Sequence, residues 1–146
     1  MYSGLQSLIS SYARDFMAGR IQSILPIYAP VLPVFIAGNR VTLGDHEQIA
    51  DSLSSHLRDV KSAGFDALHG KLVALSLPRN GCFNAVVDWT YWHQVGFPGP
   101  IGRTTYYCHL ENGLPKIDMM EYPLLAFESA CDWYSKRLDP ELLTGT

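Results

Sequence analysis

The stretch AVVDWTYWH, residues 85–93, places two tryptophans, a tyrosine and a histidine within nine residues. Side chains of a β-strand alternate between its two faces. Neither face here has the polar composition of a surface that meets only solvent. We therefore predict that one face lines a core or a ligand pocket and that the other meets a partner subunit. The first face would carry Ala85, Val87, Trp89, Tyr91 and His93, and the second Val86, Asp88, Thr90 and Trp92.

Hydrophobic periodicity and turn residues predict helices before this strand and more strands after it. A helix is expected from residue 5 to the stop at Gly19, then a short helix over 21–28 and a hairpin of strands 34–36 and 40–43 turning at Gly38-Asn39. Asp45 would cap a third helix, with Gln48 in the capping-box position and Gly64 as its end. Its apolar stripe would be Ile49, Leu53, Leu57 and Val60.

The second half of the chain is predicted to be rich in strands. Strands are expected over residues 68–77, 103–111 and 116–122, with Asn112-Gly113 turning the last pair. Residues 96–102, GFPGPIG, are expected to form a loop because glycine and proline are so frequent there. A closing helix is expected over 124–138. We predict one α+β domain over residues 1–139, followed by a flexible tail, residues 140–146.

The composition limits which classes of binding partner and which cellular compartment are expected. The 146 residues carry a net charge of −3, and no cluster of basic residues stands out, so no nucleic-acid or membrane partner is expected. The charged fraction, 17%, is low and predicts that another subunit covers part of the surface. The three cysteines lie far apart, which predicts a reduced, cytoplasmic protein without a disulfide framework. The first residues lack the charge of a signal peptide.

Three segments carry a resemblance to a known superfamily: LISSYARDFMAGRIQSILPIYA (8–29), VTLGDHEQI (41–49) and VVDWTYWHQVGFPGPIGRTTYYCHLENGLPKIDMMEY (86–122). Over about residues 5–123 the chain resembles the nuclear transport factor 2-like superfamily, which includes ketosteroid isomerases and SnoaL-like cyclases. The resemblance implies a cystatin-like α+β cone, in which a curved antiparallel sheet wraps around an N-terminal helix and a C-terminal helix follows. It also implies homodimers joined sheet to sheet.

The resemblance carries over only part of the isomerase machinery. Tyr12 falls on the oxyanion tyrosine, and Tyr106 falls on the acid that assists it. The position of the general base falls on Ile36, which cannot move a proton. Ketosteroid-type isomerisation is therefore not expected, unless His93 or Asp15 replaces the base.

Aromatic residues supply the candidate binding site. Tyr12, Trp89, Tyr91 and Tyr106 would line a pocket for a flat, largely apolar ligand, or would simply fill the cone with their own rings. Trp92 and Tyr107 lie on the opposite strand face and are the candidate dimer interface. No cofactor is expected. No metal site is expected either, because His46, Glu47, Ser52 and His56 lack metal-ligand spacing.

Three functions compete on these grounds. The first is a small-molecule-binding domain that lacks the isomerase base. The second is a noncatalytic homodimerisation or scaffold module, whose cone is filled by its own side chains. The third is a cyclase-like or isomerase-like enzyme that uses His93 or Asp15. A deep cavity lined by Tyr12, Trp89 and Tyr106 would favour the first over the second, and a titratable group within reach of it would favour the third.

Overall fold

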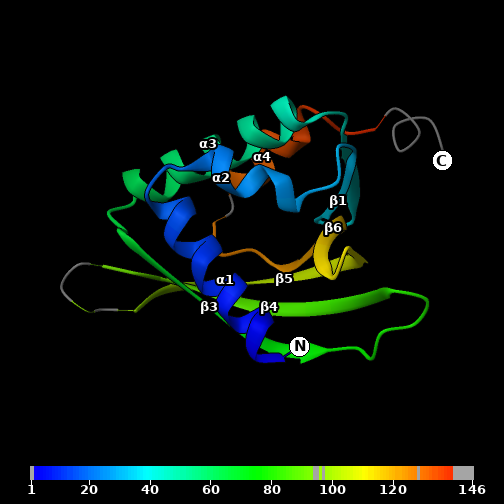
Figure 1. Cartoon of the computed structure of the whole chain (residues 1–146). Helices are drawn as coiled ribbons and strands as arrows, with labels where there is room; N and C mark the ends of the chain where they lie inside the picture. The colour runs from blue at the N-terminus through cyan, green and yellow to red at the C-terminus, as the bar shows by residue number, and fades with distance from the viewer. Residues whose placement is uncertain (1, 94–95, 97, 128, 140–146) are drawn as a thin grey trace.

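The structure is a computed structural model that describes residues 2–93, 96, 98–127 and 129–139. The predicted tail, residues 140–146, lies outside the described residues. The helical elements are α1 (Tyr2–Met17), α2 (Ile21–Ile24), the 3-10 turn η1 (Leu25–Ile27), α3 (His46–Ser62) and α4 (Ser129–Ser135) (Figure 1). The strands are β1 (Leu32–Ile36), β2 (Asn39–Leu43), β3 (Ala67–Leu75), β4 (Cys82–Trp92), β5 (Pro98–Glu111) and β6 (Leu114–Leu124).

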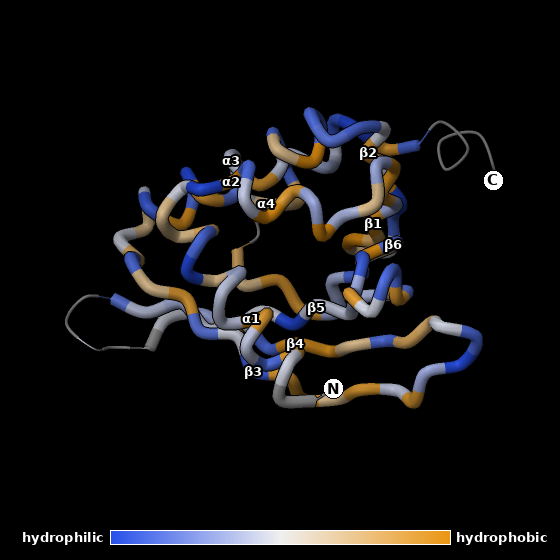
Figure 2. Tube along the Cα trace, viewed as in Figure 1, coloured by the Kyte–Doolittle hydropathy of each residue, from blue (hydrophilic) through white to orange (hydrophobic). Residues whose placement is uncertain are grey.

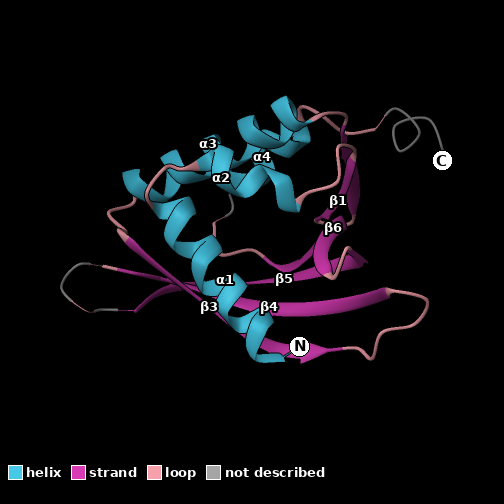
Figure 3. Cartoon of the chain, viewed as in Figure 1, coloured by secondary structure: helices cyan, strands magenta, loops and turns pink. Residues whose placement is uncertain are grey.

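The six strands form one curved sheet in the order β2-β1-β6-β5-β4-β3, and the helices lie on one side of it (Figure 3). This arrangement confirms the predicted α+β fold with its N-terminal and C-terminal helices. The sheet is mixed rather than wholly antiparallel, because β1 pairs with β6 in parallel. That pairing joins Val34 to Met120, far apart in sequence, so the local pattern of the β1–β2 hairpin gave no information about it.

Helix α1 packs closely across β3 because Gly70 of that strand has no side chain. A Cβ atom at Gly70 would lie 2.5 Å from Cγ2 of Ile9 and 2.5 Å from the Trp89 ring, so only glycine allows this approach. Gln6 of α1 adds two hydrogen bonds: its side-chain nitrogen donates to the Gly70 carbonyl at 2.9 Å, and its oxygen accepts from the Leu72 amide at 3.1 Å. These contacts fix α1 over the concave face.

Local sequence rules account for α3. The Asp45 side chain accepts a hydrogen bond from the Gln48 amide at 2.8 Å, and the Gln48 side chain accepts one from the Gly44 amide at 2.9 Å. Both residues therefore act at the start of the helix, as predicted. Gly64 has φ +90°, a left-handed conformation that ends the helix as expected.

Two predicted boundaries are wrong. The first hairpin turns at Ala37-Gly38, both with positive φ (51° and 78°), instead of Gly38-Asn39. The closing helix covers only Ser129–Ser135 and not 124–138, because β6 continues to Leu124. Pairing of β6 with β5, which extends to Arg103↔Leu124, outweighs the helical periodicity of this segment.

The predicted loop over residues 96–102 is also wrong, since β5 begins at Pro98 and pairs with the end of β4. The glycines serve close packing there instead of a turn. A Cβ atom at Gly99 would overlap the Phe65 ring, and one at Gly102 would lie 3.1 Å from the Ala126 amide nitrogen. A register shift between Thr90 and Trp92 accommodates this part of the ladder.

The alternation predicted for the aromatic strand is confirmed by its burial. Ala85, Val87, Trp89 and Tyr91 are buried, whereas the residues between them are only partly buried. The inward residues join one hydrophobic core with α1, α3 and the other strands. Figure 2 shows hydrophilic residues outside this core, along α3 and in the β3–β4 turn among other places.

Candidate functional site

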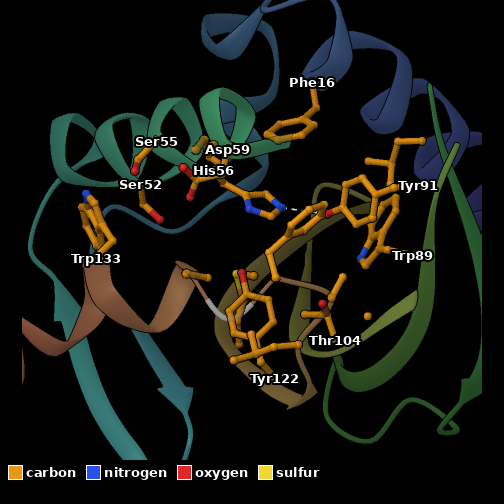
Figure 4. Close-up of a pocket in the computed structure, with 18 of the residues that line it drawn as sticks. Phe16, Ser52, Ser55, His56, Asp59, Trp89, Tyr91, Thr104, Tyr122 and Trp133 are labelled. Carbon is orange, nitrogen blue, oxygen red and sulfur yellow. Dashed lines mark hydrogen bonds between the residues drawn. The ribbon is translucent and has the colours of Figure 1, made fainter. Parts of the chain in front are cut away.

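A partly enclosed cavity of about 80 Å³ lies between α1, α3, the concave sheet and the segment that leads into α4. Its walls are mostly aromatic and aliphatic side chains, with hydroxyl groups and one imidazole among them (Figure 4). The aromatic residues of the wall are Tyr12, Phe16, Trp89, Tyr91, Tyr106, Tyr122, Phe127, Trp133 and Tyr134.

The four predicted ligand-binding residues, Tyr12, Trp89, Tyr91 and Tyr106, all line this cavity. Tyr12, Trp89 and Tyr106 also line an adjacent apolar hollow of about 50 Å³, so they form the partition between the two spaces. The indole nitrogen of Trp89 donates a hydrogen bond to the Tyr106 hydroxyl at 3.1 Å, which ties neighbouring strands together inside the cone. Burial raises the pKa of Tyr106 well above its usual range.

Tyr12 hydrogen-bonds with a second tyrosine. Its hydroxyl lies 2.5 Å from the hydroxyl of Tyr28, which follows η1 and is 2% exposed. Burial raises the pKa of Tyr12 to about 12 and that of Tyr28 well above 10. Both phenols are therefore protonated at neutral pH, and an uncharged hydrogen bond holds Tyr12, the member of the pair that lines the cavity.

A half-buried titratable group of the cavity is His56, for which the sequence predicted no role because it lacks metal-ligand spacing. Its ring reaches from α3 toward Tyr91, and Nε2 lies 2.7 Å from the Tyr91 hydroxyl (Figure 4). Burial lowers the pKa of His56 to about 4 and raises that of Tyr91. At neutral pH both partners are uncharged. The sequence feature that could have pointed to His56 is its helical spacing, because His56 and Ser52 are four residues apart beside the apolar stripe of α3.

The segment after β6 closes one side of the cavity. The hydroxyls of Tyr134 in α4 and Ser52 in α3 lie 2.9 Å apart, and the Phe127 ring packs edge-on against Tyr91 at 4.9 Å between centroids. Asp139 then anchors the segment to β2, accepting hydrogen bonds from Arg40 Nε at 2.6 Å and from the amide of Thr42 at 2.8 Å. Sequence patterns gave no indication of this anchor.

The two candidate replacements for the isomerase base lie elsewhere. The Nδ1 atom of His93 is 3.0 Å from the Gly64 carbonyl, and its ring packs at a tilt against the Phe65 ring, at 4.2 Å between centroids. The inward parity predicted for His93 does not apply, because β4 ends at Trp92. Asp15 forms an ion pair with Arg20 at 2.8 Å. Neither is among the described residues that line the cavity. Ile36, at the carried-over base position, is 3% exposed within β1.

Trp92 and Tyr107 are partly buried and belong to the outward-facing positions of β4 and β5. The Tyr107 hydroxyl donates to a carboxylate oxygen of Glu121 at 3.3 Å. Ion pairs also occur at the outward positions: Arg103 with Asp88, and His109 with Asp118, both at 2.7 Å. The Asp118 carboxylate raises the pKa of His109.

The residues that the structure describes offer neither a metal cluster nor a membrane-spanning helix. They contain no group of three or more histidine, cysteine, aspartate or glutamate side chains placed to hold a metal ion. Within the same part of the chain, every helix is too short or too polar to cross a membrane.

No protein-family model and no curated protein matches the sequence. Solved structures do match the fold. An NTF-2 like protein of unknown function from Shewanella oneidensis is 14% identical, with 84% of this chain and 98% of that chain covered and a TM-score of 0.64. An NTF2-like protein with a cystatin-like fold from Novosphingobium aromaticivorans is 12% identical, with coverage of 88% and 84% and a TM-score of 0.61.

A third match, Aln2 from a Streptomyces species, is 8% identical, with coverage of 92% of this chain and 94% of that chain and a TM-score of 0.63. At such low identities the comparison establishes the fold alone. It agrees with the resemblance that the sequence carries over residues 5–123. The chain therefore has the cystatin-like α+β fold of the nuclear transport factor 2-like superfamily.

Proposed function

We propose that the chain binds a small, largely apolar molecule inside the cone, against Tyr12, Trp89, Tyr91 and Tyr106. The observation that carries this proposal is the His56–Tyr91 hydrogen bond at the wall of a cavity lined mostly by aromatic and aliphatic side chains. Small-molecule sites commonly combine an apolar lining with a few placed polar groups. If these two side chains only filled the interior of the cone, apolar residues at both positions would fill it equally well.

The size of the cavity limits the ligand. Its 80 Å³ is roughly half of the 150 Å³ of an apolar cavity known to hold benzene. The site therefore suits a molecule of a few heavy atoms, or a single ring that projects through the open side. This small volume also keeps the scaffold function as the competing proposal.

Catalysis is the weaker alternative, and it would involve His56 in place of His93 or Asp15. His56 is the histidine of the described residues that reaches the cavity. With its pKa lowered to about 4, the imidazole accepts protons poorly at neutral pH. Binding without turnover is thus the function that the geometry supports best.

Calorimetric titration with toluene and phenol tests the binding proposal. We expect saturable binding of at least one compound, and we expect it to be lost in Ala130→Leu, which fills the cavity from α4. Ala18→Leu, at an exposed position after α1, is the matched control and should bind as the wild type does. Absence of saturable binding, or binding that Ala130→Leu leaves intact, would contradict the proposal in favour of the scaffold function.

We also propose a homodimer joined through the sheet face that bears Trp92 and Tyr107. Partly exposed aromatic side chains on a broad sheet and a charged fraction of only 17% support it.

The thiols of Cys82, Cys108 and Cys131 are all free, which supports a reduced compartment, and we propose the cytoplasm.

A further inference from the structure

The cavity offers many hydrogen-bonding groups but almost no charge. Among its described lining residues Asp59 is the single carboxylate, and neither lysine nor arginine is present. The remaining polar side-chain groups are the imidazole of His56, the indole N–H groups of Trp89 and Trp133, and the hydroxyls of serine, threonine and tyrosine. An anion bound there would find no positive partner and would meet the negative charge of Asp59.

Several of these polar groups are already paired with one another as neutral partners. His56 contacts Tyr91 at 2.7 Å, Ser52 contacts Tyr134 at 2.9 Å, and Trp89 donates to Tyr106 at 3.1 Å. Each of these hydroxyl oxygens keeps further hydrogen-bonding capacity for a ligand. The cavity is therefore built to hydrogen-bond a neutral group, without a fixed ion to pair with a charged one.

The pKa values of the cavity's own side chains show that charged groups are disfavoured there. Burial lowers the pKa of His56 to about 4, although the nearby Asp59 carboxylate opposes this shift, so a positive charge is disfavoured at that position. Burial raises the pKa values of Tyr91, Tyr106 and Tyr134, so a negative charge is disfavoured as well. A charged ligand would be subject to the same desolvation penalty.

We propose that the occupant is an uncharged molecule whose hydroxyl or carbonyl oxygen hydrogen-bonds to Tyr91, with His56 behind it, and that ionised forms are excluded. The proposal rests on the binding function proposed above. If the Tyr91 hydroxyl donates to Nε2 of His56, its oxygen accepts from a ligand hydroxyl. If Nε2–H donates to Tyr91, the Tyr91 hydroxyl donates to a ligand carbonyl. The pair thus adapts to either group and remains neutral in both cases.

The first test uses 4-nitrophenol, which ionises near neutral pH and whose phenolate absorbs visible light. The titration of His56 lies well below this range, so it does not interfere. We expect affinity to fall about tenfold per pH unit above the pKa of the free phenol. We also expect the phenolate absorbance to decrease when protein is added at a pH where both forms are present. Affinity that is independent of pH, or phenolate absorbance that increases on binding, would overturn the proposal.

A second series varies charge at constant ring size: benzyl alcohol, benzoate and benzylammonium, with toluene as the apolar reference, all at pH 7. Burial of an unpaired charge is strongly unfavourable, so we expect benzyl alcohol to bind at least roughly 100-fold more tightly than either ion. If benzoate or benzylammonium bound as tightly as the alcohol, the proposed preference for uncharged ligands would be refuted, but the binding function would not. Failure of every compound, toluene included, would instead refute the proposed binding function.

A variant pair locates the polar contact. Tyr91→Phe should reduce the affinity for phenol to that for toluene, an equally large molecule without the hydroxyl, while leaving toluene binding in place. Tyr107→Phe, on the opposite face of the sheet, should change neither affinity. Phenol binding that Tyr91→Phe does not weaken would overturn the role of Tyr91. If Tyr91→Phe does not fold, the pH series on the wild type still decides whether the ligand is neutral.

Discussion

Nε2 of His56 lies 2.7 Å from the hydroxyl of Tyr91, and this contact joins α3 to β4 across the interior of the cone. The two residues are separated by 35 positions in sequence. Each satisfies the other's polar group in a setting where an unpaired one would cost about 1–3 kcal/mol. Burial keeps both side chains neutral at pH 7, and this sets the chemical character of the cavity.

Stability should depend on pH through His56. The folded pKa of about 4 lies below the unfolded value near 6.5, so between these values the unfolded state binds more protons. The free energy of unfolding should therefore rise by an amount on the order of 1–3 kcal/mol between pH 4 and pH 6.5. Above pH 6.5 this contribution of His56 is fully present. Chemical denaturation of His56→Asn across this range should show a smaller rise. The exposed His69→Asn is the control, and an identical slope in all three proteins would contradict the role of His56.

Tyr12→Phe should destabilise the fold by about 1–3 kcal/mol, because it leaves the buried Tyr28 hydroxyl without its 2.5 Å partner. The double variant Tyr12→Phe/Tyr28→Phe should cost less than the sum of the two single changes. Denaturant titration of the four proteins measures this coupling, and strict additivity would exclude it. If Tyr12→Phe also leaves phenol affinity unchanged, Tyr12 is a packing residue and its carried-over role as a ligand donor is wrong.

Trp89→Ala should lower the free energy of unfolding by roughly 3–5 kcal/mol, because it removes a buried ring that packs on α1 and partitions the two cavities. It should weaken ligand binding as well, through loss of a wall. Thr90→Ala, the outward neighbour on β4, should change stability far less. Comparable losses in the two variants would mean that the inward face of β4 does not dominate the core.

Ketosteroid-type isomerisation should be undetectable above background. Ile36 occupies the carried-over base position, and a general base contributes roughly 100- to 10,000-fold to such reactions. A spectrophotometric assay with a β,γ-unsaturated ketone tests this expectation. Robust turnover would show that another group moves the proton. The variants His56→Gln, His93→Gln and Asp15→Asn would then identify it.

The protein should be a dimer at micromolar concentration, measured by light scattering after size exclusion. Trp92→Glu should produce a monomer, because it places a charge in the proposed interface. Leu77→Glu, at an exposed position beyond β3, should remain dimeric. A monomeric wild type would refute the proposed interface.

Several features were determined by the sequence alone, because they depend on neighbouring residues. The cap formed by Asp45 and Gln48 needs only a side chain within reach of the first turn. The inward positions of Val87, Trp89 and Tyr91 follow from strand alternation. Together with the order of elements, these local rules were enough to predict an α+β domain, whereas the cone-shaped arrangement was implied by the resemblance to a known superfamily.

Only the tertiary structure decided the rest, because it depends on contacts between distant segments. The composition around Gly99 and Gly102 predicts a loop, yet both lie in β5, which pairs with β4. These positions are glycine because Phe65 and Ala126 approach their backbone too closely for a side chain. His56 has no distinguishing motif in the sequence. Its role arises because α3 and β4 bring it against Tyr91, and because the surrounding core removes enough water to keep its imidazole neutral.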